Sequence, residues 1–115
     1  MLVKRYSEVV PTPYDKKLAG VTMREMITAA DGAPTFAMRV FDLVPGAATP
    51  YHQHEWEHEV FIVAGKGVVK SEQGDRPFAT GDTIFIPVNE HHCFVAETTV
   101  QFVCVIPVPR ACLAG

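Results

Sequence analysis

The chain of 115 residues lacks the features of several protein classes. No apolar run approaches the roughly 18 residues that a membrane helix needs. The N-terminal residues MLVKRYSEVVPTPYD lack the apolar segment and small-residue cleavage site of a signal peptide. Positive charge is not in excess, because 10 lysines and arginines face 13 aspartates and glutamates for a net charge of −3. We therefore expect a cytoplasmic protein that binds neither a membrane nor nucleic acid.

Cysteine is scarce, and its spacing excludes two kinds of site. The three cysteines cannot all pair within one chain, and none lies in a CxxC motif: Cys93, Cys104 and Cys112. This spacing supports neither a zinc knuckle nor a thioredoxin-like motif. We interpret these residues as two small buried hydrophobic side chains and a thiol near the terminus.

The sequence also lacks a long stretch with helical periodicity, and only Asp15–Leu18 is expected to form a helical turn. Instead, 9 prolines and 8 glycines are spread along the chain. Between them lie short runs rich in valine, isoleucine, phenylalanine and threonine, a rhythm typical of a β-sandwich or barrel. The sequence therefore predicts a single all-β domain. The expected strands are Val21–Thr28, Thr35–Leu43, Glu59–Val63, Gly67–Ser71, Thr83–Pro87, Cys93–Glu97 and Val100–Ile106.

Several of these strands are apolar on both faces. Val100–Ile106 and Val60–Val63 are nearly continuous apolar runs, whereas one face of a single open sheet is usually polar. Such strands face a filled core on one side and another sheet or another subunit on the other. A jelly roll that forms a homodimer satisfies both requirements.

The five histidines all lie between positions 52 and 92. His52 and His54 are two residues apart, so on an extended strand their rings point to the same side. His58 follows after a possible bend, and His92 stands between an expected turn and an expected strand. Neutral imidazoles that meet at one point suit a divalent first-row metal.

The stretch His54–His58 also reads HExxH, the motif of zincin metalloproteases. That motif works only on a helix, where residues four apart share a face. Pro45, Gly46 and Pro50 precede the stretch closely, and a β-type run follows it. No useful helix fits between them, so we reject the protease interpretation.

The two histidine segments together resemble the cupin family. Gly46-(x5)-His52-x-His54-(x3)-His58-Glu59, closing at Gly65 and Gly67, is similar to the first cupin motif. Gly81-Asp82-(x4)-Pro87-x-Asn89-(x2)-His92 is similar to the second, with Asn89 where the family often has glycine. Asparagine also tolerates the left-handed conformation of such a turn. The resemblance covers about residues 35–106, after an N-terminal arm of about residues 1–20.

The resemblance implies one cupin domain across residues 1–115, a double-stranded β-helix or jelly-roll barrel with a metal in its mouth. It is strongest to small single-domain manganese cupins with four histidine ligands, which are dimers associated with oxidative alkene cleavage. This implies Mn²⁺ held by His52, His54, His58 and His92. Imidazole also accepts Fe²⁺, Ni²⁺, Cu²⁺ and Zn²⁺.

The fourth ligand has an alternative, because many cupins use a glutamate at the position of Glu59. On a strand, His58 shares a face with Val60, and Glu59 shares the other face with Phe61. Both faces are apolar, so strand parity does not choose between them, and the resemblance favours His58. His91 is expected to point away from the site.

Five further residues are candidates for the pocket wall: Arg39, Phe41, Phe94, Phe102 and Cys104. Arg39 is the only charge in an otherwise apolar part of its expected strand. One interpretation places it on an outer face or interface, since arginine snorkels easily. The other places it at the barrel mouth, where it attracts a carboxylate or enolate.

Three functions fit these expectations. The first is a manganese- or iron-dependent dioxygenase-like enzyme that acts on a small enol or alkene. The second is a redox-neutral sugar or uronate isomerase or lyase, which needs a proton-transfer residue such as Glu57, Glu59 or Glu90. The third is a non-catalytic small-molecule-binding protein. The fold alone does not choose, because it carries many unrelated chemistries.

Overall fold

The structure is a computed structural model that describes residues 1–14 and 19–108. The expected turn at Asp15–Leu18 and the thiol of Cys112 lie outside these residues. The elements, in chain order, are the 3-10 turns η1 (Tyr6–Glu8) and η2 (Ala29–Asp31) and the strands β1 (Thr12–Pro13), β2 (Val21–Ile27), β3 (Phe36–Leu43), β4 (His58–Ala64), β5 (Lys66–Ser71), β6 (Arg76–Ala79), β7 (Thr83–Ile86), β8 (His92–Ala96) and β9 (Val100–Pro107).

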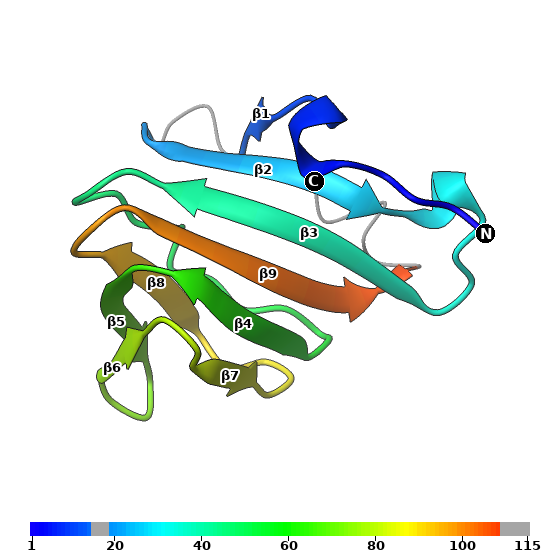
Figure 1. The fold of residues 1–115 in the computed structure, drawn as a ribbon. Helices are drawn as coiled ribbons and strands as arrows, with labels where there is room; N and C mark the ends of the chain where they lie inside the picture. The colour runs from blue at the N-terminus through cyan, green and yellow to red at the C-terminus, as the bar shows by residue number, and fades with distance from the viewer. Residues whose placement is uncertain (15–18, 109–115) are drawn as a thin grey trace.

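The strands form two antiparallel sheets. The larger sheet has the order β1-β2-β3-β9-β4-β7, and the smaller has the order β6-β5-β8. Figure 1 shows the smaller sheet packed behind the β4 end of the larger one. The all-β prediction is therefore confirmed, and no helix of the described residues is long and apolar enough to cross a membrane.

The seven expected strands are all present, each within one residue of its expected ends. Two strands were not expected. β6 is only four residues long and contains Pro77, which lowers any expectation of a strand. β1 has two residues, and its pairing with β2 is a tertiary contact without a local sequence signal.

The core lies between the two sheets. Burial alternates strictly along β9, so that Phe102, Cys104 and Ile106 point inward. The ring of Phe102 stacks on that of Phe41 and packs at a tilt of 36° against that of Phe94, with both pairs of centroids 4.9 Å apart. Burial of each such side chain contributes about 1.5–3 kcal/mol. These three aromatic rings line the same cavity as His52, His58 and His92.

The outer face of the larger sheet is also apolar, as the sequence predicts. Phe61 and Val63 of β4 are 47% and 39% exposed, and Phe85 of β7 is 58% exposed. Val103 and Val105 of β9, the strand on the other side of β4 from β7, line the same hollow and are half-buried. The expectation that a second copy of the chain covers this face stays a prediction.

Candidate metal centre

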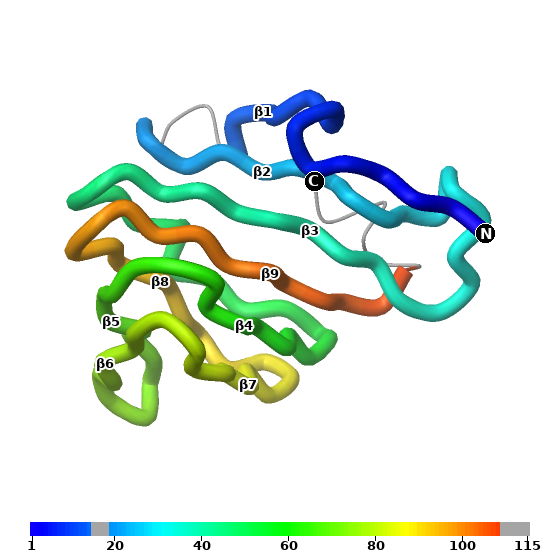
Figure 2. Tube along the Cα trace, in the orientation of Figure 1, coloured from blue at the N-terminus to red at the C-terminus, as the bar shows by residue number. Residues whose placement is uncertain are grey.

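The segment before β4 is held against β8. The Thr49 backbone N–H donates to the Phe94 carbonyl at 3.0 Å, and further along His52 and His92 exchange two backbone hydrogen bonds of 3.1 and 2.9 Å. The two chain segments therefore run antiparallel there, with His52 directly opposite His92. Figure 2 shows this connection, after β3 and before β4, passing beside β8. A local hydrogen-bond ladder thus brings together histidines forty residues apart in the sequence.

Four imidazole rings meet beside this ladder, and we call them the four-histidine cluster (His52, His54, His58 and His92). The ring centroids are 4.3 Å apart for His52 and His54, and 5.3 Å apart for His52 and His92. The ring of His58 lies 4.9 Å from that of His54 and 5.1 Å from that of His92. The four rings named from the sequence therefore lie in one place.

His91 lies outside this cluster. Its ring stacks on that of Tyr51 at 5.6 Å, and its Nδ1 lies 2.9 Å from a carboxylate oxygen of Glu72. His91 is more exposed than its neighbour His92. The expectation that His91 points away from the site is therefore confirmed.

The HExxH stretch is not helical. Residues 55 and 56 form a bend, and β4 begins at His58. The Trp56 ring stacks on that of His54, with the centroids 4.4 Å apart and the planes 15° apart. The chain therefore lacks the helix that the protease motif requires.

Strand β4 separates the two candidates for the fourth ligand. His58 is 5% exposed and lies on the inner face with Val60 and Ile62. Glu59 is exposed and lies on the outer face, where it lines hollows with Phe61 and Val105. Only His58 therefore shares a side of the sheet with the other three rings.

Hydrogen bonds orient the two most buried rings. Nδ1 of His92 donates to the Glu90 carbonyl at 2.8 Å. A carbonyl only accepts, so the proton is on Nδ1 and the lone pair is on Nε2. Nδ1 of His58 lies 3.4 Å from Sγ of Cys104, and its Nε2 is buried with no hydrogen-bond partner among the described residues. Each ring therefore has an Nε2 that its protein neighbours leave for another ligand.

Burial and mutual repulsion keep the cluster neutral. Burial, together with the charge that neighbouring histidines would carry, lowers the pKa of His58 to about 2 and those of His52 and His54 to about 4. Burial also lowers the pKa of His92. The neutral imidazole is the form that binds metals.

The donor set fits a divalent first-row metal, because neutral imidazole nitrogens are ligands that such ions accept. The orphaned Nε2 of His58 supports the same conclusion. Within residues 1–14 and 19–108, however, no three histidine, cysteine or acidic side chains have their donor atoms arranged to hold an ion. The rings of His54 and His58 are stacked, with their planes 27° apart. Binding an ion therefore requires the rings to turn about their side-chain torsions.

A narrow cavity of about 20 Å³ adjoins the cluster. A space of this size holds about one water molecule. All five residues expected in the pocket wall line it: Arg39, Phe41, Phe94, Phe102 and Cys104. Tyr14 and Thr49 line it as well. These two residues carry no local sequence signal, because Tyr14 belongs to the N-terminal segment and Thr49 to the β3–β4 connection, outside the expected strands.

Arg39 is inside the barrel and only 5% exposed, rather than on an outer face or interface. Its Nη2 lies 3.5 Å from Sγ of Cys104, its partner in the β3–β9 register. Burial raises the pKa of the Cys104 thiol. The cavity therefore combines an apolar wall, a neutral thiol and one buried cation.

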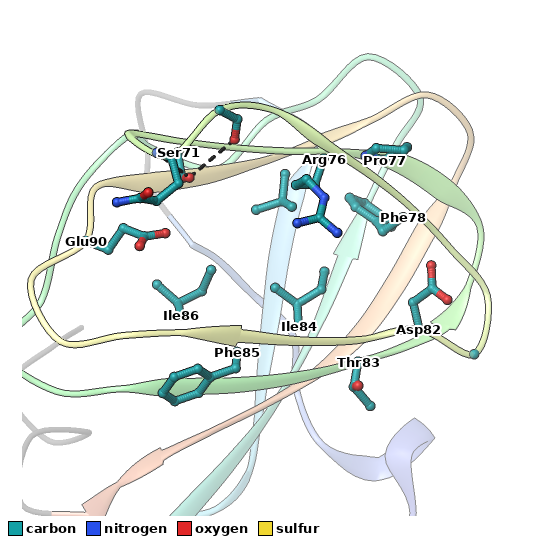
Figure 3. A pocket seen from close by; sticks show the side chains of 14 residues that line it. Ser71, Arg76, Pro77, Phe78, Asp82, Thr83, Ile84, Phe85, Ile86 and Glu90 are labelled. Atoms are coloured by element: carbon teal, nitrogen blue, oxygen red, sulfur yellow. Dashed lines mark hydrogen bonds between the residues drawn. The ribbon is translucent and has the colours of Figure 1, made fainter.

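A larger hollow of about 630 Å³ lies between β7 and the β5–β6 hairpin. Figure 3 shows Ile84 and Ile86 pointing into it, toward Arg76 and Phe78, whereas Phe85 points away. None of its lining residues is a histidine. This hollow is therefore separate from the four-histidine cluster.

We expect acid to destabilise the metal-free protein. In the unfolded chain each histidine titrates near the ordinary pKa of 6.5, whereas in the folded chain His52 and His54 titrate near 4. Between these values the unfolded chain binds more protons, so the free energy of unfolding falls as the pH falls. Urea unfolding in the presence of a chelator, from about pH 7 to 5, measures this slope. His58→Ala should flatten it and His91→Ala should not; an unchanged slope in both variants would contradict the expectation.

Similarity to known proteins agrees with the fold. Residues 39–106 match the family described as Cupin domain. The polyketide cyclase RemF from Streptomyces resistomycificus is 32% identical, with 94% of this chain and 80% of that chain covered and a TM-score of 0.86. A predicted oxalate decarboxylase from Thermotoga maritima is 28% identical, with 93% and 99% covered and a TM-score of 0.79. The sequence matches no curated protein. From the matched family, the RemF likeness and the two-sheet fold, we conclude that this chain belongs to the cupin family.

Proposed function

We propose that the protein is a metal-dependent enzyme that acts on an enolisable carbonyl compound. In this proposal His52, His54, His58 and His92 hold one divalent ion, and the reacting end of the substrate enters the adjoining cavity. The observation that carries the proposal is the meeting of four neutral imidazoles beside a cavity with an aromatic wall. Without an ion, the buried Nε2 of His58 has no hydrogen-bond partner among the described residues, which is costly to the fold.

The ligand set determines what the ion supplies. Four neutral imidazoles leave its full double positive charge in place, and when bound it polarises a carbonyl oxygen or stabilises an enolate as a Lewis acid. The sequence resemblance favours Mn²⁺, and the same rings accept Fe²⁺, Ni²⁺, Cu²⁺ or Zn²⁺.

The chain's own residues orient the ligands and exclude water. The Glu90 carbonyl and the Cys104 sulfur fix the rings of His92 and His58 through their Nδ1 atoms. Phe41, Phe94 and Phe102 form the apolar side of the cavity. Because the cavity is narrow, only the reacting end of a substrate fits inside, and the remainder extends past the half-buried His52 and His54.

A redox-neutral cyclisation is the reaction that we favour. A poly-carbonyl chain loses a proton between two carbonyl groups, the resulting enolate carbon bonds to a distant carbonyl carbon, and the new alkoxide takes up a proton. Such a carbon acid needs only a weak base, which accords with a cavity lining that includes no carboxylate. The similarity to the polyketide cyclase RemF supports this choice.

Oxidative cleavage of a small enol or alkene with dioxygen is the second candidate. The apolar wall and the small volume of the cavity favour it, since a diatomic molecule fits such a space. The isomerase or lyase alternative is less favoured, because Glu59 lies on the outer face.

Product mass separates the two reactions. The protein loaded with Zn²⁺, Mn²⁺ or Fe²⁺ is incubated with a linear triketone while dissolved oxygen is recorded. Cyclisation gives a product of the substrate's mass, or of that mass less one water, with no oxygen consumed. Oxygen uptake with a product heavier by one dioxygen, or its cleavage fragments, supports the second candidate. If the metal-loaded protein forms neither product with any compound in a panel of enols, the enzyme proposal is wrong. His92→Ala serves as the inactive control.

A further inference from the structure

Arg39 is a buried cation without a counter-ion in the described part of the chain. The ion pairs found there join Lys4 with Asp31, Arg24 with Asp42, Lys70 with Asp75, and His91 with Glu72. None includes Arg39. Glu25, its cross-strand partner on β2, is exposed and forms no ion pair with it. Within residues 1–14 and 19–108, no acidic side chain therefore neutralises the positive charge of Arg39.

The hydrogen bonds of this guanidinium are weak. Nη1 lies 3.8 Å from Sδ of Met23, Nη2 lies 3.5 Å from Sγ of Cys104, and the buried Nε has no hydrogen-bond partner among the residues that the structure describes. The guanidinium carbon lies 5.1 Å from the centre of the Phe41 ring. Sulfur is a poor acceptor, so these contacts replace little of the hydration that burial removes.

A neighbouring arginine shows the ordinary arrangement. On β2, Arg24 pairs with Asp42 at 3.1 Å, and it also donates to the Tyr6 hydroxyl and to the Val9 carbonyl. Arg24 thus has an anion and two oxygen acceptors. Arg39 is more deeply buried, and among the described residues its guanidinium has only the two sulfur acceptors and no anion. A buried charge that no protein group neutralises is costly to the fold. Such a charge is retained at a cost that a bound anion would offset.

The location of Arg39 shows where an anion would bind. Arg39 lines the same narrow cavity as Cys104 and His58. The residues that line this cavity include no aspartate or glutamate. An anionic oxygen atom in this cavity would therefore meet the Arg39 guanidinium without facing a carboxylate.

We infer that Arg39 is an anion-binding group and that the cavity takes a small ligand with a carboxylate or enolate oxygen. The guanidinium presents parallel N–H groups, which match a carboxylate or the two oxygens of an enolised dicarbonyl. The part of this inference that concerns the charge of the substrate rests on the proposed function, because the metal ion would bind the same anionic end of the substrate. The anion site itself requires only Arg39 and the cavity, so it is tested without metal.

Thermal unfolding of the metal-free protein tests the inference, with acetate as the probe. Acetamide serves as its uncharged counterpart, and sodium chloride keeps the ionic strength constant. We expect acetate, but not acetamide, to raise the unfolding midpoint of the native protein to a plateau. In Arg39→Met acetate should bind about 10- to 100-fold more weakly, so the midpoint should not rise at acetate concentrations that give half of the plateau in the native protein. Without acetate, its midpoint should equal or exceed that of the native protein, because a buried charge has been removed.

Arg24→Met is the matched control. It should lower the midpoint by breaking the Arg24–Asp42 pair, and it should leave the response to acetate intact. A response to acetate that survives in Arg39→Met, or that acetamide reproduces, would overturn the inference. Arg39→Gln is the second variant, and failure of both Arg39 variants to fold would also overturn it, since the guanidinium would then be a structural group.

The two proposals fail separately. If acetate binds through Arg39 but no carbonyl substrate reacts on the metal-loaded protein, the anion site stands and the enzyme proposal fails. If the triketone reacts while Arg39→Met keeps the response to acetate, the enzyme proposal stands and the anion site fails.

Discussion

His92→Ala is expected to lose bound metal altogether. His92 is 3% exposed, its Nδ1 donates to the Glu90 carbonyl, and its ring centroid lies 5.3 Å from that of His52 and 5.1 Å from that of His58. Loss of a group that merely orients a ligand weakens metal binding 10- to 100-fold, so loss of the ligand should weaken it by more than about 100-fold. Elemental analysis after dialysis against a buffer without added metal measures the stoichiometry.

His58→Ala should behave in the same way, and two exposed neighbours provide the controls. Glu59→Ala changes the outer face of β4, and His91→Ala changes a ring that lies outside the cluster. Both variants should keep the metal content of the native protein. If Glu59→Ala loses the metal while His58→Ala keeps it, the assignment of the fourth ligand is wrong. Full metal content in His92→Ala would refute the four-histidine site.

Gly65→Ala is expected to destabilise the fold by at least about 3 kcal/mol. Gly65 joins β4 to β5 with φ of +100°, a conformation that residues with a Cβ rarely adopt. An added Cβ would lie 2.1 Å from the Thr99 carbonyl oxygen and 3.0 Å from Cα of Val100. These are backbone atoms at the start of β9, so the collision can be relieved only by moving the strand. Urea unfolding monitored by circular dichroism measures the change.

Gly74→Ala separates the two causes. Gly74 has φ of +106°, but an added Cβ would meet no atom within 4 Å. Only the backbone strain remains, about 1–2 kcal/mol. The difference between the two variants therefore measures the contact between Gly65 and the Thr99 carbonyl. If Gly65→Ala and Gly74→Ala lost the same stability, the collision between the added Cβ and the Thr99 carbonyl would contribute nothing, and the prediction would be wrong.

Much of the architecture could be predicted because its signals are local. Short β-type runs between glycine and proline turns marked seven strands, and Asn89, expected in a left-handed turn, has φ of 63°. The proline and glycine before His52 and the β-type run after His58 excluded a helix, and the structure has a bend there. Strand β6 was not predicted, because its four residues include Pro77 and carry no alternating pattern of their own. The strand is defined by its pairing with β5.

By itself the sequence determined which side chains share a face of each strand, because side chains alternate at every residue. It therefore paired His58 with Val60, and Glu59 with Phe61. Only the tertiary structure decided which of those two faces lies against the core, because both faces are apolar. The packing of the smaller sheet on the larger one determines which face is buried. The same closure turned Arg39 inward, brought Tyr14 and Thr49 to the cavity, and set His52 against His92. These are contacts between distant segments, and the period of a single strand carries no information about them.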